Sequence, residues 1–140
     1  MSAARRVPDA LVHEAALLSL AWRLALWALP WRAVHTAAWG LTELLPLSQR
    51  RPRPQGARAA EVGAAFSQVP RFVPRATCLV QALSAHLMLV RRNLHSALHL
   101  GVKRAAEAPF GAHAWVESDG EAVVGGDGSG FVRMEPLVRT

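Results

Sequence analysis

The chain has 140 residues, of which 51% are hydrophobic and 19% are charged, a balance that is typical of one globular domain and excludes a disordered chain. Its single cysteine excludes an internal disulfide and is expected of a protein in the reducing cytoplasm. The net charge of +6 suits an anionic partner. Because no basic cluster is interleaved with aromatic residues, we expect no nucleic-acid binding.

An apolar segment, residues 15–31, lies near the N-terminus and invites interpretation as a membrane span. Arg23 lies near its middle, and a central arginine costs about 2.5–3.5 kcal/mol in a bilayer. The basic residues that open the chain are not followed by the cleavage site of a signal peptide. We therefore expect a helix over residues 10–29, with Asp9 as its N-cap or first-turn acid, that is buried in protein or lies at an interface.

Further helices and loops are predicted in the N-terminal half. A second helix should cover residues 31–45 and end before Pro46, and a Pro- and Arg-rich stretch, residues 48–56, should form an exposed loop. A short helix is expected at residues 57–68. The segment at residues 69–75 should be extended, because its two prolines oppose a helix.

The strongest helical pattern covers residues 76–92, where Thr77 can cap the start and Asn93 can adopt the left-handed conformation that ends a helix. The period of apolar residues then changes from about 3.6 to 2, which predicts strands. Asp119-Gly120 is a strong hairpin signal. The expected strands are residues 95–102, 112–118 and 121–125, with an edge strand at 131–137. Helices followed by an antiparallel sheet define an α+β fold.

Cys78 stands at the predicted start of the helix over residues 76–92, and His113 stands in the second predicted strand. A helix N-terminus offers unpaired N–H groups and a partial positive charge, which favour a thiolate nucleophile. A histidine on a neighbouring strand can act as general base and then as general acid. The alternative is that a lone cysteine is a small core hydrophobe. The pattern favours a thiol enzyme that performs acyl transfer.

Five short motifs follow one another over residues 78–120. They are Cys78-Leu79-Val80-Gln81-Ala82-Leu83, Leu89-Val90-Arg91-Arg92-Asn93, His99-Leu100-Gly101-Val102, Gly111-Ala112-His113-Ala114-Trp115-Val116-Glu117 and Asp119-Gly120. This ordered set resembles the lasso-peptide biosynthesis B proteins in their stand-alone protease form. The resemblance implies a papain- and transglutaminase-like cysteine peptidase that removes a leader peptide, with Cys78 as nucleophile and His113 as base. The resemblance covers residues 70–137, and the N-terminal part resembles the family only in length and style. From the chain length we expect one domain, residues 1–140, with a helical N-terminal part at 1–69 and the protease core at 70–140.

The resemblance also implies an aspartate on the strand after His113. A two-residue turn at Asp119 would place His113 opposite Gly126, and Asp127 is next to that position. A bulge allowed by the nearby glycines would turn Asp127 inward. The alternatives are Asp119, which more readily makes the turn, and Glu117, which is expected to face solvent or a neighbouring helix.

Other polar and aromatic residues receive structural interpretations. His86 lies on the apolar helix face and is expected in the core. His95 and His99 share one strand face, but without a cysteine or carboxylate cluster in register they do not predict a zinc site. We expect no metal and no cofactor. Trp115 shares a strand face with His113 and would shield it from water.

The resemblance further implies partners. Stand-alone family members lack a leader-recognition domain, and we expect no room for one here. A precursor peptide substrate, a separate leader-binding protein and an asparagine-synthetase-like cyclase are therefore expected. The N-terminal helices would suit contact with such a partner or peripheral contact with a membrane. Two alternatives stay open, namely a transglutaminase-like acyltransferase and an inactive scaffold that binds peptide.

Overall fold

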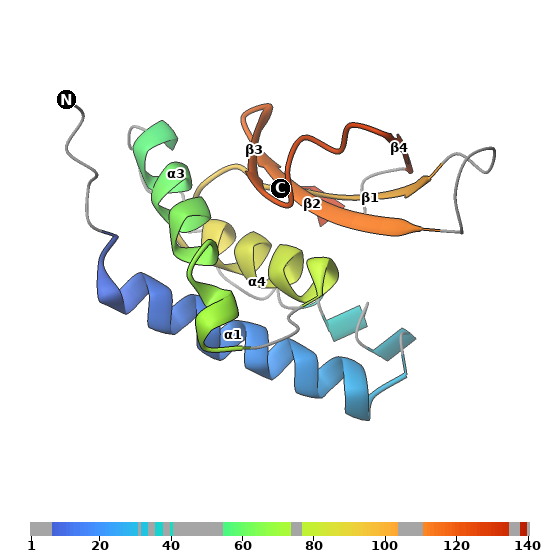
Figure 1. Cartoon of the computed structure of the whole chain (residues 1–140), viewed down its shortest axis with the longest axis horizontal. Coiled ribbons are helices and arrows are strands. Elements are labelled where there is room, and N and C mark those ends of the chain that lie inside the picture. Colours follow the sequence, from blue (N-terminus) through green and yellow to red (C-terminus); the bar gives the residue numbers. More distant parts are fainter. Residues whose placement is uncertain are drawn as a thin grey trace.

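The computed structural model of the chain describes residues 7–30, 32–33, 36–37, 40, 55–73, 77–103, 111–134 and 138–139. Helices come first, strands follow, and the helices pack on one face of a small antiparallel sheet, so the predicted α+β class is confirmed (Figure 1). The elements in chain order are α1 (Asp9–Ala28), α3 (Gln55–Phe66), the 3-10 turn η1 (Val69–Arg71), α4 (Cys78–Arg91), β1 (Ala97–Lys103), β2 (Ala112–Ser118), β3 (Glu121–Val124), β4 (Phe131–Arg133) and β5 (Val138–Arg139).

Most predicted helices lie where the apolar pattern places them. Asp9 is the first-turn acid of α1, whose N-cap is Pro8. The segment predicted as extended starts instead with η1, because Pro70 stands in its first turn, where a missing N–H is tolerated. The described residues of the predicted second helix, 32–33, 36–37 and 40, are helical. The rest of that helix and residues 48–54 of the predicted loop lie outside the described residues. Residues 55–56, predicted as loop, are instead the first residues of α3.

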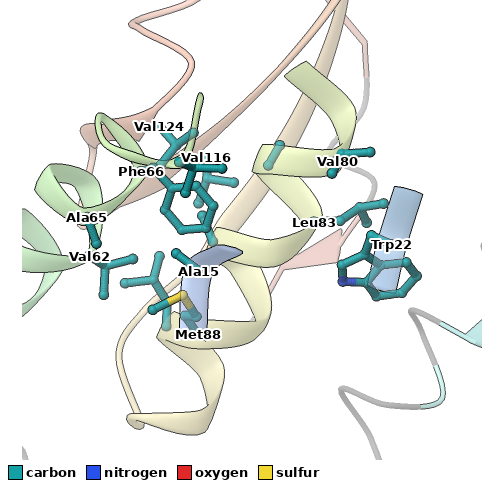
Figure 2. Close-up of a cluster of buried hydrophobic side chains, with 14 of the residues drawn as sticks. Ala15, Trp22, Val62, Ala65, Phe66, Val80, Leu83, Met88, Val116 and Val124 are labelled. Atoms are coloured by element: carbon teal, nitrogen blue, oxygen red, sulfur yellow. The ribbon is translucent and has the colours of Figure 1, made fainter. Parts of the chain in front are cut away.

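α4 is the central helix of the fold and is buried on almost every side, because it packs against α1, α3 and the sheet. Thr77 caps it as predicted, since its Oγ1 accepts a hydrogen bond from the Val80 N–H at 3.3 Å. Asn93 follows it with φ of 57°, the left-handed conformation predicted there. Figure 2 shows the core around α4, which includes Ala15, Trp22, Val62, Phe66, Leu83, Met88, Val116 and Val124.

The sheet is antiparallel throughout, with strand order β3-β2-β1-β4, and β5 also pairs with β1. The edge strand predicted at residues 131–137 is therefore β4, and it lies beside β1 rather than beside β3. Consequently the chain between Val124 and Phe131 crosses from one edge of the sheet to the other.

The predicted turn joins β2 and β3, and Ser118 pairs with Glu121. A bulge follows. Glu117 pairs with Ala122, but Val116 then pairs with Val124, so Val123 is an extra residue in β3. The uninterrupted register, which placed His113 opposite Gly126, is therefore wrong.

Val123, the extra residue of the bulge, lies against α3. α3 lies so close to this residue that a Cβ added at Gly63 would be 2.6 Å from the Val123 carbonyl oxygen. Only a glycine in α3 allows this approach, and the bulged backbone of β3 fills the space it leaves.

β2 carries different side chains on its two faces. Ala114 and Val116 belong to the core shared with the helices. Trp115 is only 1% exposed but packs on the opposite face of the sheet. The loop at residues 125–130 covers it there, because a Cβ added at Gly128 would lie 2.5 Å from the indole ring. The sheet thus has a second, smaller packed face, away from the helices.

Candidate active site

Cys78 is the first residue of α4, as predicted. Its side chain is half-buried and packs against the helical core. The first-turn N–H groups of α4 and the positive end of its dipole lie at this position. A helix N-terminus is one of the positions at which nucleophilic cysteines are found in enzymes.

His113 lies near the start of β2, on the face of Trp115. Its imidazole stacks on Trp115, with ring centroids 6.0 Å apart, and on Phe131, with centroids 5.0 Å apart. Its Nε2 atom lies 2.6 Å from the Gly125 carbonyl oxygen. A carbonyl oxygen only accepts, so Nε2 carries the proton and Nδ1 keeps a lone pair. Nδ1 is therefore the basic atom of this imidazole.

Cys78 and His113 belong to elements that pack on one another, since α4 lies against β2. The alternation of β2, however, directs His113 to the Trp115 face, whereas Cys78 packs on the helical core. Among the described residues no hydrogen bond joins the Cys78 thiol to His113. The pairing of these two side chains stays a prediction.

Asp127 lies in the loop after β3 and is exposed. Its Oδ1 accepts a hydrogen bond from the Ser129 N–H at 2.9 Å, and this bond holds the pKa of the carboxyl below its ordinary value. In the described part of the chain no hydrogen bond joins Asp127 to His113. Its role as third catalytic residue stays a prediction. Asp119 is exposed and occupies the turn with φ of 51°.

Glu117 differs from expectation, because it faces neither solvent nor a helix. Its Oε1 accepts hydrogen bonds from Trp115 Nε1 at 3.1 Å and from Arg133 Nη2 at 2.7 Å. Its Oε2 lies 3.2 Å from His99 Nε2. Burial alone would raise the pKa of Glu117, but the indole hydrogen bond, His99 and Arg133 outweigh it and lower the pKa. The alternation of β2 could have indicated this placement, because Glu117 shares a face with His113 and Trp115.

Arg133 and His99 complete the surroundings of Trp115. The Arg133 guanidinium lies 5.4 Å from the centroid of the indole, a cation–π geometry. The His99 imidazole stacks on the same indole at 5.4 Å between ring centroids. The Trp115 ring is thus held by a hydrogen bond, a cation and two stacked imidazoles, one of which belongs to His113.

The core assignment of His86 is confirmed. It is buried, its Nδ1 lies 2.7 Å from Ser96 Oγ, and burial lowers its pKa to about 4. His95 is exposed and His99 is paired with Glu117. Across the described ranges, no three His, Cys, Asp or Glu side chains are grouped closely enough to hold a metal ion.

A cavity of about 350 Å³ lies between α3 and the β2–β3 turn. Ser118, whose hydroxyl is buried, lies at one side of it. Because Ser118 and His113 stand at opposite ends of β2, this cavity is separate from the candidate catalytic residues.

The chain is an α+β domain in which a thiol stands in the first turn of a helix that packs on an antiparallel sheet, a layout consistent with a transglutaminase-like domain. A family description of the transglutaminase-like superfamily matches residues 16–139, and the chain belongs to this superfamily. Its members are usually enzymes of the cysteine-protease type. No curated protein and no solved structure gives a significant match.

Proposed function

We propose that this chain is a cysteine peptidase that removes the leader peptide from a lasso-peptide precursor in the cytoplasm. Membership of the transglutaminase-like superfamily supports a thiol enzyme. The place of Cys78 at the first turn of α4 supports its role as nucleophile. The bond from His113 Nε2–H to Gly125 carries the proposal furthest, because it leaves Nδ1 free to take a proton.

In the proposed reaction, His113 Nδ1 takes the proton of the Cys78 thiol as Sγ attacks the carbonyl carbon of the scissile amide. The Cys78 backbone N–H stabilises the oxyanion of the tetrahedral intermediate. Nδ1 then gives its proton to the leaving amine, and the C–N bond breaks to leave a thioester. A water molecule, deprotonated by Nδ1, hydrolyses the thioester and restores the thiol.

Asp127 is proposed as the carboxylate that orients His113 during this reaction. The bulge shifts the pairing of β2 and β3 by one residue. If the pairing of Val116 with Val124 continued along both strands, it would bring Asp127 opposite His113. The Gly125 carbonyl occupies Nε2 in the structure and selects the tautomer that a carboxylate would select. If β3 extended when substrate binds, the His113 Nε2–H would donate to the Asp127 carboxylate instead of to the Gly125 carbonyl.

The proposed removal of a leader peptide also implies partners. A separate leader-binding protein would deliver the precursor to Cys78, and an asparagine-synthetase-like cyclase would receive the released core peptide. The net charge of +6 supports association with an acidic peptide or protein.

The test is cleavage of the precursor peptide by the purified chain together with the leader-binding protein, followed by mass spectrometry. We expect free leader and free core peptide from the wild type. Cys78→Ala and Cys78→Ser should yield no product, with unchanged circular dichroism, whereas His95→Ala should cleave normally because His95 is exposed and outside the site.

Two results would contradict the proposal, and each would favour one of the alternative functions. With an added alkylamine such as cadaverine, a core or leader fragment heavier by the amine would indicate an acyltransferase. Binding of the precursor without any product, for wild type and Cys78→Ala alike, would indicate a scaffold.

A further inference from the structure

α1 exposes a row of large apolar side chains along its outer side. Leu17 is 67% exposed, Leu20 45%, Leu24 57% and Trp27 88%. They follow one another at spacings of three and four, so they form one continuous ridge. Phe72, 55% exposed, stands just after η1, which packs against α1, and its ring lies 6.1 Å from that of His13. These five side chains are called the α1 ridge below.

The opposite side of α1 is fastened to the protein. Val12, Ala15 and Trp22 are buried against the helical core. The Glu14 carboxylate binds both Arg91 and Arg92 at the end of α4 and has a lowered pKa because of the Arg92 hydrogen bond and these two charges.

This attachment favours contact of α1 with the surface of a bilayer over insertion across it. By length and composition alone it could cross a membrane, a test that core helices also pass. Crossing would expose the buried side chains and leave Glu14 without its two arginines. α1 lies outermost, with α4 between it and the sheet (Figure 1). The α1 ridge therefore meets a surface from the side, with the helix lying flat.

The charges around the ridge favour an anionic surface. Arg23 on α1 and Arg71 on η1 are exposed beside it. Residues 17–28 include no acidic residue, and the whole chain carries a net charge of +6. The ridge is convex and carries a tryptophan near its end, which suits the deformable headgroup region of a bilayer, where Trp and Arg side chains concentrate.

We propose that the α1 ridge docks this protein peripherally on an anionic lipid bilayer, with Leu17, Leu20, Leu24, Trp27 and Phe72 at the headgroup boundary. Arg23 and Arg71 would contact lipid phosphates. The proposal does not depend on peptidase activity. The sheet lies on the other side of α4 from α1, so docking through the ridge leaves the sheet facing away from the bilayer (Figure 1).

The experiment is cosedimentation of the full chain with vesicles of phosphatidylcholine and phosphatidylglycerol, against vesicles of phosphatidylcholine alone. Two double variants are compared, L17D/L24D in the ridge and A60D/A64D on exposed positions of α3. Both add the same two negative charges to a helix surface, but only L17D/L24D also removes two large apolar side chains, which are the ones proposed to enter the headgroup boundary. Thermal unfolding by circular dichroism checks that each remains folded.

We expect binding to anionic vesicles that falls by about tenfold or more in L17D/L24D and by much less in A60D/A64D. Weaker binding to phosphatidylcholine alone is expected. Absence of binding by the wild type, or equal loss in both variants, would overturn the proposal. Concentration-dependent dimers in light scattering, abolished by L17D/L24D without vesicle binding, would assign the ridge to a second copy of the chain instead.

Discussion

His113 Nε2 lies 2.6 Å from the carbonyl oxygen of Gly125, across the β2–β3 pair. This single contact selects the tautomer of the imidazole and leaves a lone pair on Nδ1, the atom proposed as the base. In the proposed mechanism this backbone carbonyl would fix the imidazole tautomer, one of the two tasks of the carboxylate in a catalytic triad.

Gly125→Ala should therefore impair catalysis more than Gly126→Ala. Both glycines have positive φ, 87° and 78°, so both substitutions cost about 1–2 kcal/mol of backbone strain. Only at Gly125 would the new Cβ meet the Ala114 carbonyl oxygen, at 2.7 Å, and displace the contact to His113. We expect kcat/KM to fall about tenfold or more below that of Gly126→Ala.

The measurement pairs cleavage kinetics with ¹⁵N NMR of His113. The wild type should show the Nε2–H tautomer, and Gly125→Ala a mixture. Equal losses in the two variants, or an Nδ1–H tautomer in the wild type, would contradict the proposed role of the carbonyl.

His113→Ala should be as damaging as loss of Cys78, because members of one catalytic unit act together. Asp127→Ala should be at least about tenfold milder, and Asp119→Ala milder still. Single-turnover cleavage of the precursor measures all three. A larger loss in Asp119→Ala than in Asp127→Ala, with the fold unchanged, would move the third catalytic role to the turn.

Glu117 should matter for stability and for the seating of Trp115. Glu117→Leu removes the acceptor for Trp115 and Arg133 and the neighbour of buried His99, so we expect a loss of about 1–3 kcal/mol in the free energy of unfolding. Glu117→Gln keeps the acceptor and should lose less. Urea unfolding with near-UV circular dichroism of Trp115 checks this, with exposed Glu121→Gln as the control. A loss in Glu117→Leu no greater than in the control would show that the network is incidental.

Stability should fall as the pH is lowered from about 6.5 towards 4, because burial lowers the pKa of His86 to about 4. In this window the unfolded chain binds a proton at His86 and the folded chain does not, so protons favour unfolding, by about 3 kcal/mol at pH 4. His86→Gln should flatten this slope, whereas His95→Gln, at an exposed position, should not. Urea unfolding across the pH range measures it. An unchanged slope in His86→Gln would refute the assignment.

The isolated chain should cleave its precursor poorly, and a leader-binding partner should raise the rate by raising the local concentration of precursor at Cys78. Part of the association should weaken with salt, because the chain carries a net charge of +6. Initial rates with and without the partner, over a salt series, test this. Full activity of the lone chain, indifferent to any partner, would favour a general peptidase.

Features that depend on neighbours along the chain could be predicted from the sequence. Apolar periodicity located α1 and α4, Thr77 supplied the cap that places Cys78 at a helix start, and Asn93 and Asp119-Gly120 marked the helix end and the turn. These are local effects of hydrogen bonding and allowed backbone angles, which a few consecutive residues determine.

The tertiary structure decided what distant segments impose on one another. The bulge in β3 lies against Gly63 of α3, and it shifts by one residue the register that the turn alone would set. Glu117 is enclosed because β4 returns to the far side of β1 and brings Arg133 to it. His113 contacts the Gly125 carbonyl across the β2–β3 pair, where the register is shifted by the bulge. Which groups meet across a sheet depends on how all its strands and the helix behind it pack together, and no short stretch of sequence carries that information.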